Sequence, residues 1–364
     1  MKTNILGKVI VAYHSPCMDG YGAACAHYAN SELLRDHVLY KGVSYGFLGS
    51  MPTMESFPWE DGSITNIIFL DICPTRETLD FLTKVKGFRI TIVDHHKTAK
   101  TILSGYDNQE VRYLIADKFS GASLTMALGK DIDKLAFGKD FKPNGEVDHY
   151  DPLMGGFLTN VDHSVFGLIN RERITSLYGL LEVRDIWIED DLEIKAMADH
   201  LAAYLKFHDI SKEPVGNIDV MIQDQGGLNE VLIIGKTIDK VQRAVVTDSL
   251  SASYKSKLVL RGNTQVELCV GVCPDGMGSM FGDMWNKSVE GGSLAVALFY
   301  NLRANEIGVS LRSNNDLARK VAEELGGGGH DNAAGCAIRT NTKIGDLPSI
   351  NAIIRKIESI LIHM

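Results

Sequence analysis

The first part of the chain alternates short runs of apolar and β-branched residues with segments of helical periodicity. The runs that predict strands are residues 8–13, 38–45, 66–70, 89–93 and 112–116. The segments that predict helices are residues 22–34, 75–85, 120–128 and 192–206. Strands that alternate with helices are typical of a doubly wound α/β domain with a mainly parallel sheet. We therefore expect this architecture for residues 1–190.

The pattern changes after a connecting helix and linker, which we place at residues 191–216. Beyond it, strands are predicted at residues 231–234, 257–261, 264–272, 293–300 and 306–311, and helices at residues 316–325 and 349–362. Strands followed by helices predict a smaller, mixed α+β domain over residues 217–364. Residues 130–173 fit neither pattern and contain Asp148-His149 and Asp162-His163. A second metal site is one interpretation of them, but we favour an inserted surface segment.

Acidic and imidazole side chains follow the predicted strands of the first domain. His14 and Asp19 come after the first strand, Asp71 after the third, and Asp94-His95-His96 after the fourth. In a doubly wound sheet the ligand crevice lies beyond the carboxyl ends of the strands, so we expect these side chains to meet there. Asp185 follows later in the chain. Carboxylates and imidazoles together suit divalent cations such as Mn²⁺ and Mg²⁺.

This order of motifs resembles the DHH phosphoesterase superfamily, which carries a His/Asp strand end, a lone Asp, the DHH triplet and a later Asp. The segment from Gly326 to Gly335 similarly resembles the GGGH-x-x-AAG signature of the DHH-associated substrate-binding domain. The resemblance implies a two-metal site with two Mn²⁺ ions, Mg²⁺ being possible. The first metal would be bound by His14 and Asp71. The second would be bound by Asp19, Asp71, His95 and Asp185, with Asp71 as the bridge.

The same resemblance implies roles for residues beside the metals. Asp94, His95 and His96 are the catalytic candidates. Asp94 and His96 would lie close to the metals and orient ligands or contact the substrate. Many family members carry a further aspartate at the position of Cys17, so this residue is either a thiolate ligand or a small buried thiol, and both interpretations stay open.

Substrate binding is expected in the second domain. Gly328, Gly329 and His330 lie in a glycine-rich segment in which backbone N–H groups can approach an anion closely. Arg312 ends a predicted strand and is a candidate phosphate clamp, although structural pairing is a close alternative. The resemblance implies that this domain binds a nucleotide across a cleft between the domains.

Composition narrows the classes of partner. The chain has 364 residues, 46 acidic and 37 basic side chains, and a formal net charge of −9. A protein that grips long nucleic acid usually shows a basic stripe, and none is found, so we expect no long duplex partner. No apolar run approaches the roughly 18 residues of a membrane span. Without an export signal, and with cysteine spacings that match no disulfide scaffold, a cytoplasmic protein is expected. A homodimer is compatible with the sequence.

The function that this resemblance implies is metal-dependent hydrolysis of phosphodiesters in short oligonucleotides (nano-RNA and dinucleotides) through two-metal activation of water. Within enzymes, the alternatives are a phosphohydrolase for cyclic dinucleotides or for bisphosphorylated nucleotides. Polyphosphate and pyrophosphate are further alternatives, although the His330 segment disfavours pyrophosphate. From another class, a nucleotide-binding sensor with a degenerate metal site is suggested by Cys17 alone.

Overall fold

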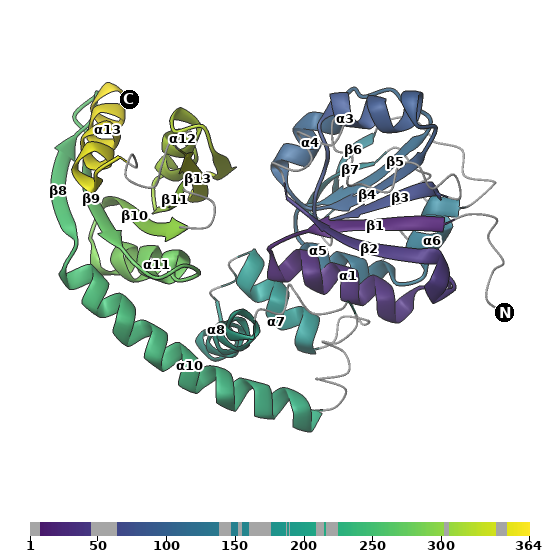
Figure 1. The fold of residues 1–364 in the computed structure, drawn as a ribbon, viewed down its shortest axis with the longest axis horizontal. Helices are drawn as coiled ribbons and strands as arrows, with labels where there is room; N and C mark the ends of the chain where they lie inside the picture. Colours follow the sequence, from purple (N-terminus) through teal and green to yellow (C-terminus); the bar gives the residue numbers. More distant parts are fainter. Residues whose placement is uncertain are drawn as a thin grey trace. The chain divides into compact units, whose positions relative to one another are not determined.

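The computed structural model describes residues 8–44, 64–137, 147–151, 155–159, 176–186, 188, 190–208, 215, 225–301, 306–339 and 348–364 (Figure 1). The chain divides into two compact units, Met1–Ile238 and Asp239–Met364. None of the described helices combines the length and the apolar character that crossing a membrane requires.

The N-terminal unit is built on a mainly parallel sheet. Its strand order is β2-β1-β3-β4-β5-β7-β6. The parallel strands are β1 (Lys8–His14), β2 (Val38–Val43), β3 (Ile64–Leu70), β4 (Arg89–Asp94) and β5 (Val111–Ala116). An antiparallel hairpin, β6 (Val147–Asp151) and β7 (Gly155–Thr159), extends the sheet beyond β5. The predicted doubly wound α/β class is confirmed.

Helices cover both faces of this sheet, as Figure 1 shows. Alternate residues of β1 point to opposite faces, so Val9 and Val11 join one core and Ile10 and Ala12 the other. The first core is covered by α1 (Met18–Asn30), α5 (Gly121–Leu128), α7 (Ser176–Asp185) and α8 (Leu192–Phe207). The second is covered by α3 (Arg76–Asp80), the π-helical turn η3 (Phe81–Val85) and α4 (Lys97–Leu103). A short 3₁₀ turn, η1 (Arg35–His37), precedes β2.

The C-terminal unit holds a smaller mixed sheet with the order β12-β13-β11-β10-β9-β8. Its strands are β8 (Tyr254–Val259), β9 (Gln265–Val272), β10 (Gly292–Asn301), β11 (Glu306–Ser313), β12 (Gly328–His330) and β13 (Ala333–Arg339). Strands β9 and β10 are parallel and are joined by α11 (Gly278–Ser288), whereas the other pairs are antiparallel. Helices α12 (Leu317–Glu324) and α13 (Ile350–His363) pack on one face. The predicted mixed α+β class is confirmed.

One predicted strand is wrong. Residues 231–234 belong to the long helix α10 (Gln225–Ser251). Leu228, Val231 and Leu232 lie at helical spacing, and all three are buried in the core of the N-terminal unit. A run of four apolar residues cannot by itself distinguish a strand from one buried side of a helix, and here tertiary packing decides.

The segment at residues 130–173, which we interpreted as a surface insertion, contributes partly to the packed unit. It contains α6 (Asp131–Phe137) and the β6–β7 hairpin, and Ile132, Leu135 and Leu158 are buried. Asp148 and His149 lie in β6, but their side chains are outside the described part of the structure. Asp162 and His163 are also outside the described residues.

Candidate metal centre

The acidic and imidazole residues predicted for the N-terminal unit converge at one edge of its sheet. His14 ends β1, Asp71 directly follows β3, and Asp94 ends β4 with His95 and His96 after it. Because β1, β3 and β4 are parallel neighbours, their carboxyl ends lie side by side. Two helices complete the cluster: Asp19 is in the first turn of α1, and Asp185 is the last residue of α7.

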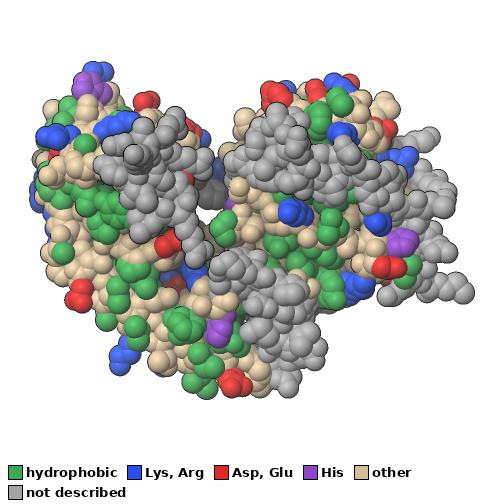
Figure 2. All heavy atoms as spheres, viewed as in Figure 1, with side chains coloured by type: hydrophobic (Ala, Val, Ile, Leu, Met, Phe, Trp, Pro, Cys, Tyr) green, Lys and Arg blue, Asp and Glu red, His purple; other side chains and the backbone are tan. Residues whose placement is uncertain are grey.

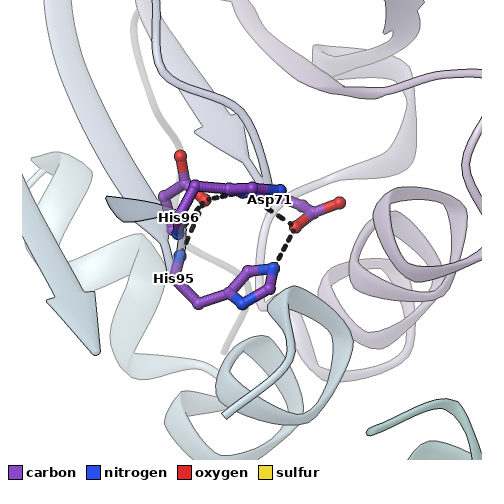
Figure 3. A group of neighbouring side chains, drawn as sticks. Asp71, His95 and His96 are labelled. Atoms are coloured by element: carbon purple, nitrogen blue, oxygen red, sulfur yellow. Dashed lines mark hydrogen bonds and ion pairs between the residues drawn. The ribbon is translucent and has the colours of Figure 1, made fainter. Parts of the chain in front are cut away.

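Asp71 lies at the centre of the cluster. Its Oδ2 atom is 3.4 Å from His14 Nδ1, and its Oδ1 atom is 3.1 Å from His95 Nε2 and 3.8 Å from His96 Nδ1. Dashed lines in Figure 3 join its carboxylate to the rings of His95 and His96. Asp71 adopts a left-handed backbone conformation with φ of 60°, which aspartate tolerates better than most residues. A Cβ atom at Gly121 would lie only 2.5 Å from that of Asp71, so glycine is required there.

His95 connects Asp71 to the two helix-borne acids. Its Nε2 atom lies 3.3 Å from Asp185 Oδ2 and 3.7 Å from Asp19 Oδ2. The Asp19 carboxylate also accepts hydrogen bonds from the backbone N–H groups of Gly121 at 2.5 Å and Ala122 at 3.0 Å. These are orphan donors at the start of α5, where the helix dipole favours a negative charge. Asp19 is thereby fixed by a second helix.

Asp94 contacts the histidines that follow it. Its Oδ1 atom accepts hydrogen bonds from the backbone N–H of His95 at 2.7 Å and of His96 at 3.2 Å. The same oxygen is 2.7 Å from Nδ1 of the His96 ring, which donates to it when that nitrogen carries the proton. Asp94 is fully buried. In this structure Asp94 therefore orients the His95–His96 turn and the His96 ring.

The potential ligand atoms form three overlapping groups, each with all atoms within 4.8 Å of one another. The groups are His14, Cys17 and Asp71; Asp19, His95 and Asp185; and Asp71, Asp94, His95 and His96. The first two resemble the two ligand sets that the family resemblance implies, but Cys17 is added to the first and Asp71 is missing from the second. Asp71 belongs to the first group and lies within reach of the second through His95.

The charges of the cluster are strongly coupled. Burial by itself raises the pKa of Asp71, but the close imidazoles of His14 and His95 outweigh it and hold that pKa far below its ordinary value. Burial lowers the pKa of His95, but Asp71 and Asp185 outweigh it and raise that pKa well above the usual range. Burial and the repulsion of neighbouring carboxylates raise the pKa of Asp19, and burial raises that of Asp185. Without a cation, the cluster thus holds protons at neutral pH.

Several of its buried atoms lack a hydrogen bond. In the described part of the chain these include both oxygens of Asp71, Nε2 of His95 and Oδ2 of Asp185. Leaving buried polar atoms unsatisfied is costly, and bringing carboxylates together in a buried site raises that cost. Divalent cations would coordinate these atoms and neutralise the negative charge of the clustered carboxylates. The mixed oxygen and nitrogen set is one that Mn²⁺ and Mg²⁺ accept.

The glycine-rich segment of the C-terminal unit forms a hairpin of paired strands, β12 and β13. Gly328 pairs with Gly335, and Gly329 pairs with Ala334. At Gly329, φ is 142° and an added Cβ would lie 2.6 Å from the Cα atom of Ala334, so close strand packing already requires glycine. An added Cβ at Gly328 would meet no atom within 4 Å, so packing does not explain that glycine.

Arg312 and His330 are brought to the same level of the C-terminal sheet. In register, Arg312 of β11 is opposite Ala333 of β13, which is opposite His330 of β12. Arg312 Nη2 donates to Ser279 Oγ at 2.6 Å, and Nη1 donates to the carbonyl oxygen of Leu311 at 2.8 Å. Its guanidinium is therefore held by local partners. The side chain of His330 is outside the described part of the structure.

The sequence analysis identified the helix at residues 120–128 but missed its contribution to the site. Because Gly121 has no Cβ atom, the Asp71 side chain can pack against it. The first turn of the helix binds the Asp19 carboxylate. The available signal was the serine cap followed by glycine, Ser120-Gly121, at the start of the helix. It could not reveal the contact because Asp19 and Gly121 are 102 positions apart.

Comparisons with known proteins agree with these motifs. Residues 268–361 match the family model described as the DHHA1 domain. No curated protein matches the sequence significantly. Similar solved structures include an exopolyphosphatase-related protein from Bacteroides fragilis, which is 15% identical with a TM-score of 0.47 and covers 98% of this chain and 93% of its own.

Two further solved structures are similar over nearly the full chain. Exonuclease RecJ bound to manganese is 13% identical with a TM-score of 0.49, covering 98% of this chain and 89% of its own. The pGpG-specific phosphodiesterase PggH from Vibrio cholerae is 11% identical with a TM-score of 0.33, covering 97% of this chain and 98% of its own. The DHHA1 match confirms the resemblance to the DHH phosphoesterase superfamily for the C-terminal unit, over residues 268–361.

Proposed function

We propose that this protein is a metal-dependent phosphodiesterase that hydrolyses short oligonucleotides, with dinucleotides and nano-RNA as its substrate class. The observation that carries the proposal is the buried cluster around Asp71, in which two groups of ligand-type atoms are linked through one carboxylate. Two divalent cations that share a carboxylate are a recurrent device for hydrolysing phosphate esters.

The proposed ligands of one cation are His14 and Asp71, with Cys17 as the candidate third ligand. Those of the other are Asp19, Asp71, His95 and Asp185. When bound, such cations lower the pKa of water and stabilise negative charge on phosphoryl oxygens. Mn²⁺ is the proposed physiological ion because imidazole nitrogens accompany the carboxylates, with Mg²⁺ as the alternative.

Asp94 and His96, the remaining residues of the cluster, orient side chains and hold a proton. Asp94 holds the ring of His96 through Nδ1 and fixes the turn that carries His95. Burial lowers the pKa of His96, but Asp94 outweighs it and raises that pKa, which favours the protonated ring. A protonated His96 can bind a phosphoryl oxygen or donate a proton to the leaving oxygen. We propose this role for His96, with Asp94 as its positioning partner.

In this proposal, the C-terminal unit determines which substrate lengths are accepted. The match to the DHHA1 domain covers Arg312 and the Gly328–His330 strand, which the family resemblance implicates in substrate binding. The formal net charge of −9 also favours a substrate of few phosphates, whose charge is met locally by cations. On the face that Figure 2 draws, the described Lys and Arg side chains are scattered among other residue types.

The experiment that tests the proposal is a product analysis with Mn²⁺. Short RNA, short DNA, linear and cyclic dinucleotides, a bisphosphorylated nucleotide and pyrophosphate are each incubated with the full chain, with and without excess chelator. The proposal predicts turnover of the short linear substrates that chelator abolishes. Preferred turnover of cyclic dinucleotides, bisphosphorylated nucleotides or pyrophosphate would reassign the substrate, and full activity in chelator would contradict metal dependence.

One observation supports a function of another class. Cys17 stands in the first ligand group where many family members carry an aspartate, and burial raises the pKa of its thiol well above the usual range. A protein whose first site is too weak for catalysis would be a nucleotide sensor. It would bind a dinucleotide in the presence of Mn²⁺ without forming product, which the same assay detects.

A further inference from the structure

A buried polar contact joins helix α7, which carries Asp185, to helix α5, whose first turn binds Asp19. The Ser123 hydroxyl of α5 donates a hydrogen bond to the Glu182 carboxylate of α7. Ser123 is fully buried, and Glu182 is only 6% exposed. A carboxylate so removed from water is tolerated only where polar partners hold it, so this contact constrains both helices.

On the α5 side, Ser123 belongs to the turn that contacts the metal-ligand cluster. The Ser123 backbone N–H donates to Ser120 Oγ at 3.2 Å, and the Ser120 N–H donates to Ser123 Oγ at 3.0 Å, forming a capping box. Between them, Gly121 and Ala122 donate their N–H groups to Asp19. The Ser123 hydroxyl is thus held in the same turn that fixes Asp19.

On the α7 side, Glu182 and Asp185 are three residues apart, so they lie on neighbouring parts of one helix face. The N–H of Ile186 donates to the carbonyl of Glu182 at 3.0 Å, which keeps this last turn helical through Asp185. His14 and Asp71 are at strand ends, where backbone hydrogen bonds of the sheet fix them, and Asp94 binds the backbone N–H of His95. Asp185 instead depends on how α7 is packed.

Helix α7 packs closely against its neighbours on this side. A Cβ atom at Gly22 of α1 would lie 2.6 Å from Leu181 Cδ1 of α7 and 3.1 Å from the Cβ of Ala122 of α5. Apolar contacts of this kind set the separation of helices, but they direct rotation weakly compared with a hydrogen bond between two buried groups. The Ser123–Glu182 bond is therefore suited to fix the rotation of α7.

We propose that Glu182 is a positioning residue for the metal centre. Its bond to Ser123 sets the rotation of α7 and holds Asp185 Oδ2 at 3.3 Å from His95 Nε2, so that Asp19, His95 and Asp185 present their ligand atoms to one cation. The inference rests on the proposed metal-dependent function and deepens it, because one proposed cation site then depends on a contact between two residues that are not ligands.

The test is a Mn²⁺ titration of the full chain, followed by electron paramagnetic resonance of free Mn²⁺, for wild type, Glu182→Ala, Ser123→Ala and Glu182→Gln. Each alanine variant should weaken one of two Mn²⁺ sites by about tenfold or more, as loss of outer partners of a metal site generally does. The other site should be unchanged. Glu182→Gln keeps an acceptor for the Ser123 hydroxyl and should bind Mn²⁺ like wild type.

Two controls separate positioning from general loss of stability. Asn66→Ala removes another buried hydrogen bond of the same unit, from Asn66 Nδ2 to the carbonyl of Ala136 at 2.8 Å, and should lower Tm without changing Mn²⁺ binding. Ser123→Ala also removes the acceptor of the Ser120 N–H, so the double variant Ser123→Ala/Glu182→Ala should bind Mn²⁺ no more weakly than Ser123→Ala alone, because Glu182→Ala removes a bond already lost. Phosphodiesterase activity of the single variants should recover as Mn²⁺ is raised.

Different results would overturn different claims. Wild-type Mn²⁺ affinity in both alanine variants would overturn the positioning role, since the bond would then be dispensable for the site. Equal weakening in Glu182→Gln and Glu182→Ala would also overturn it, because the negative charge rather than the hydrogen bond would matter. Absence of Mn²⁺ binding by the wild-type protein would instead reject the proposed function, and this inference with it.

Discussion

The two proposed functional regions use sheet ends in different ways. In the N-terminal unit, side chains at the ends of β1, β3 and β4 form a buried cluster, and Asp71 is held against Gly121 with almost no freedom. In the C-terminal unit, Gly326–Gly329 are exposed, and the last two of them begin the short hairpin strand β12. In the proposed function, hydrolysis takes place at a closely packed cluster, whereas substrate recognition uses exposed backbone at the edge of a sheet.

The largest effect is expected at the centre of the buried cluster. Asp71→Asn should lower kcat on a short RNA substrate by more than about a hundredfold, beyond the loss typical of outer partners of a metal site, because this carboxylate belongs to both proposed ligand sets. Asp36→Asn removes an exposed carboxylate of the same unit and serves as the matched control. Comparable turnover by the two variants would remove Asp71 from the mechanism.

The next effect tests how rigid that cluster is. Gly121→Ala places a Cβ atom 2.6 Å from Asp71 Oδ1 and should displace the carboxylate, lowering activity by tens of fold and weakening Mn²⁺ binding. The control is Gly328→Ala, where the added Cβ meets no atom within 4 Å and folding should be unaffected. If Gly121→Ala kept full activity and full Mn²⁺ affinity, the cluster would be less tightly determined than the geometry indicates.

A smaller and selective effect is expected in the C-terminal unit. His330→Ala should weaken catalysis on dinucleotides by about tenfold and leave a small generic phosphodiester nearly unaffected, because only the dinucleotide uses remote binding. Gly328→Ala should raise KM for the dinucleotide without lowering Tm if substrate approaches that backbone. Equal losses on both substrates in His330→Ala would place the residue in the chemistry instead of in recognition.

The smallest effect concerns the choice of metal. If Cys17 binds a cation, Cys17→Asp should preserve activity and shift the preference from Mn²⁺ toward the harder ion Mg²⁺, whereas Cys17→Ser should weaken Mn²⁺ binding. The ratio of activities in Mn²⁺ and Mg²⁺ is the measurement. An unchanged ratio in both variants would make Cys17 a packing residue.

Pattern reasoning located the cluster because strand ends are readable from local sequence. His14, Asp71 and His95 follow apolar runs, and parallel strands bring such ends together without knowledge of side-chain packing. Glu182, Ser123 and Gly121 escaped because their importance arises from contacts between distant segments. The Ser123–Glu182 bond, for example, joins residues 59 positions apart.

The same distinction explains the wrong strand at residues 231–234 and the two possible causes of the glycine-rich segment. The apolar run 231–234 fits a strand or a buried helix side, and only its packing with Leu228 in the core decides between them. The glycines before His330 were interpreted as an anion-binding segment, yet Gly329 is explained by close packing against Ala334. Local sequence could not separate these two causes. The structure gives Gly328 neither a packing reason nor a positive φ, whereas Gly326 has a φ of 83°.

The central claim predicts a definite coupling between protons and metal. Burial lowers the pKa of His14, but Asp71 outweighs it and raises that pKa, and the pKa values of His95, Asp19 and Asp185 are also raised. The folded metal-free protein therefore binds more protons than the unfolded chain, so its stability falls as pH rises through these raised values. A cation must displace the same protons, so its apparent affinity should rise with pH.

The most direct measurement is calorimetric titration of the metal-free protein with MnCl₂ at pH 6, 7 and 8, in buffers of different ionisation enthalpy that report released protons. The account predicts two bound Mn²⁺ ions, release of protons on binding, tighter binding at higher pH, and loss of both sites in Asp71→Asn. Absence of Mn²⁺ binding, or binding that is independent of pH and unchanged in Asp71→Asn, would contradict it.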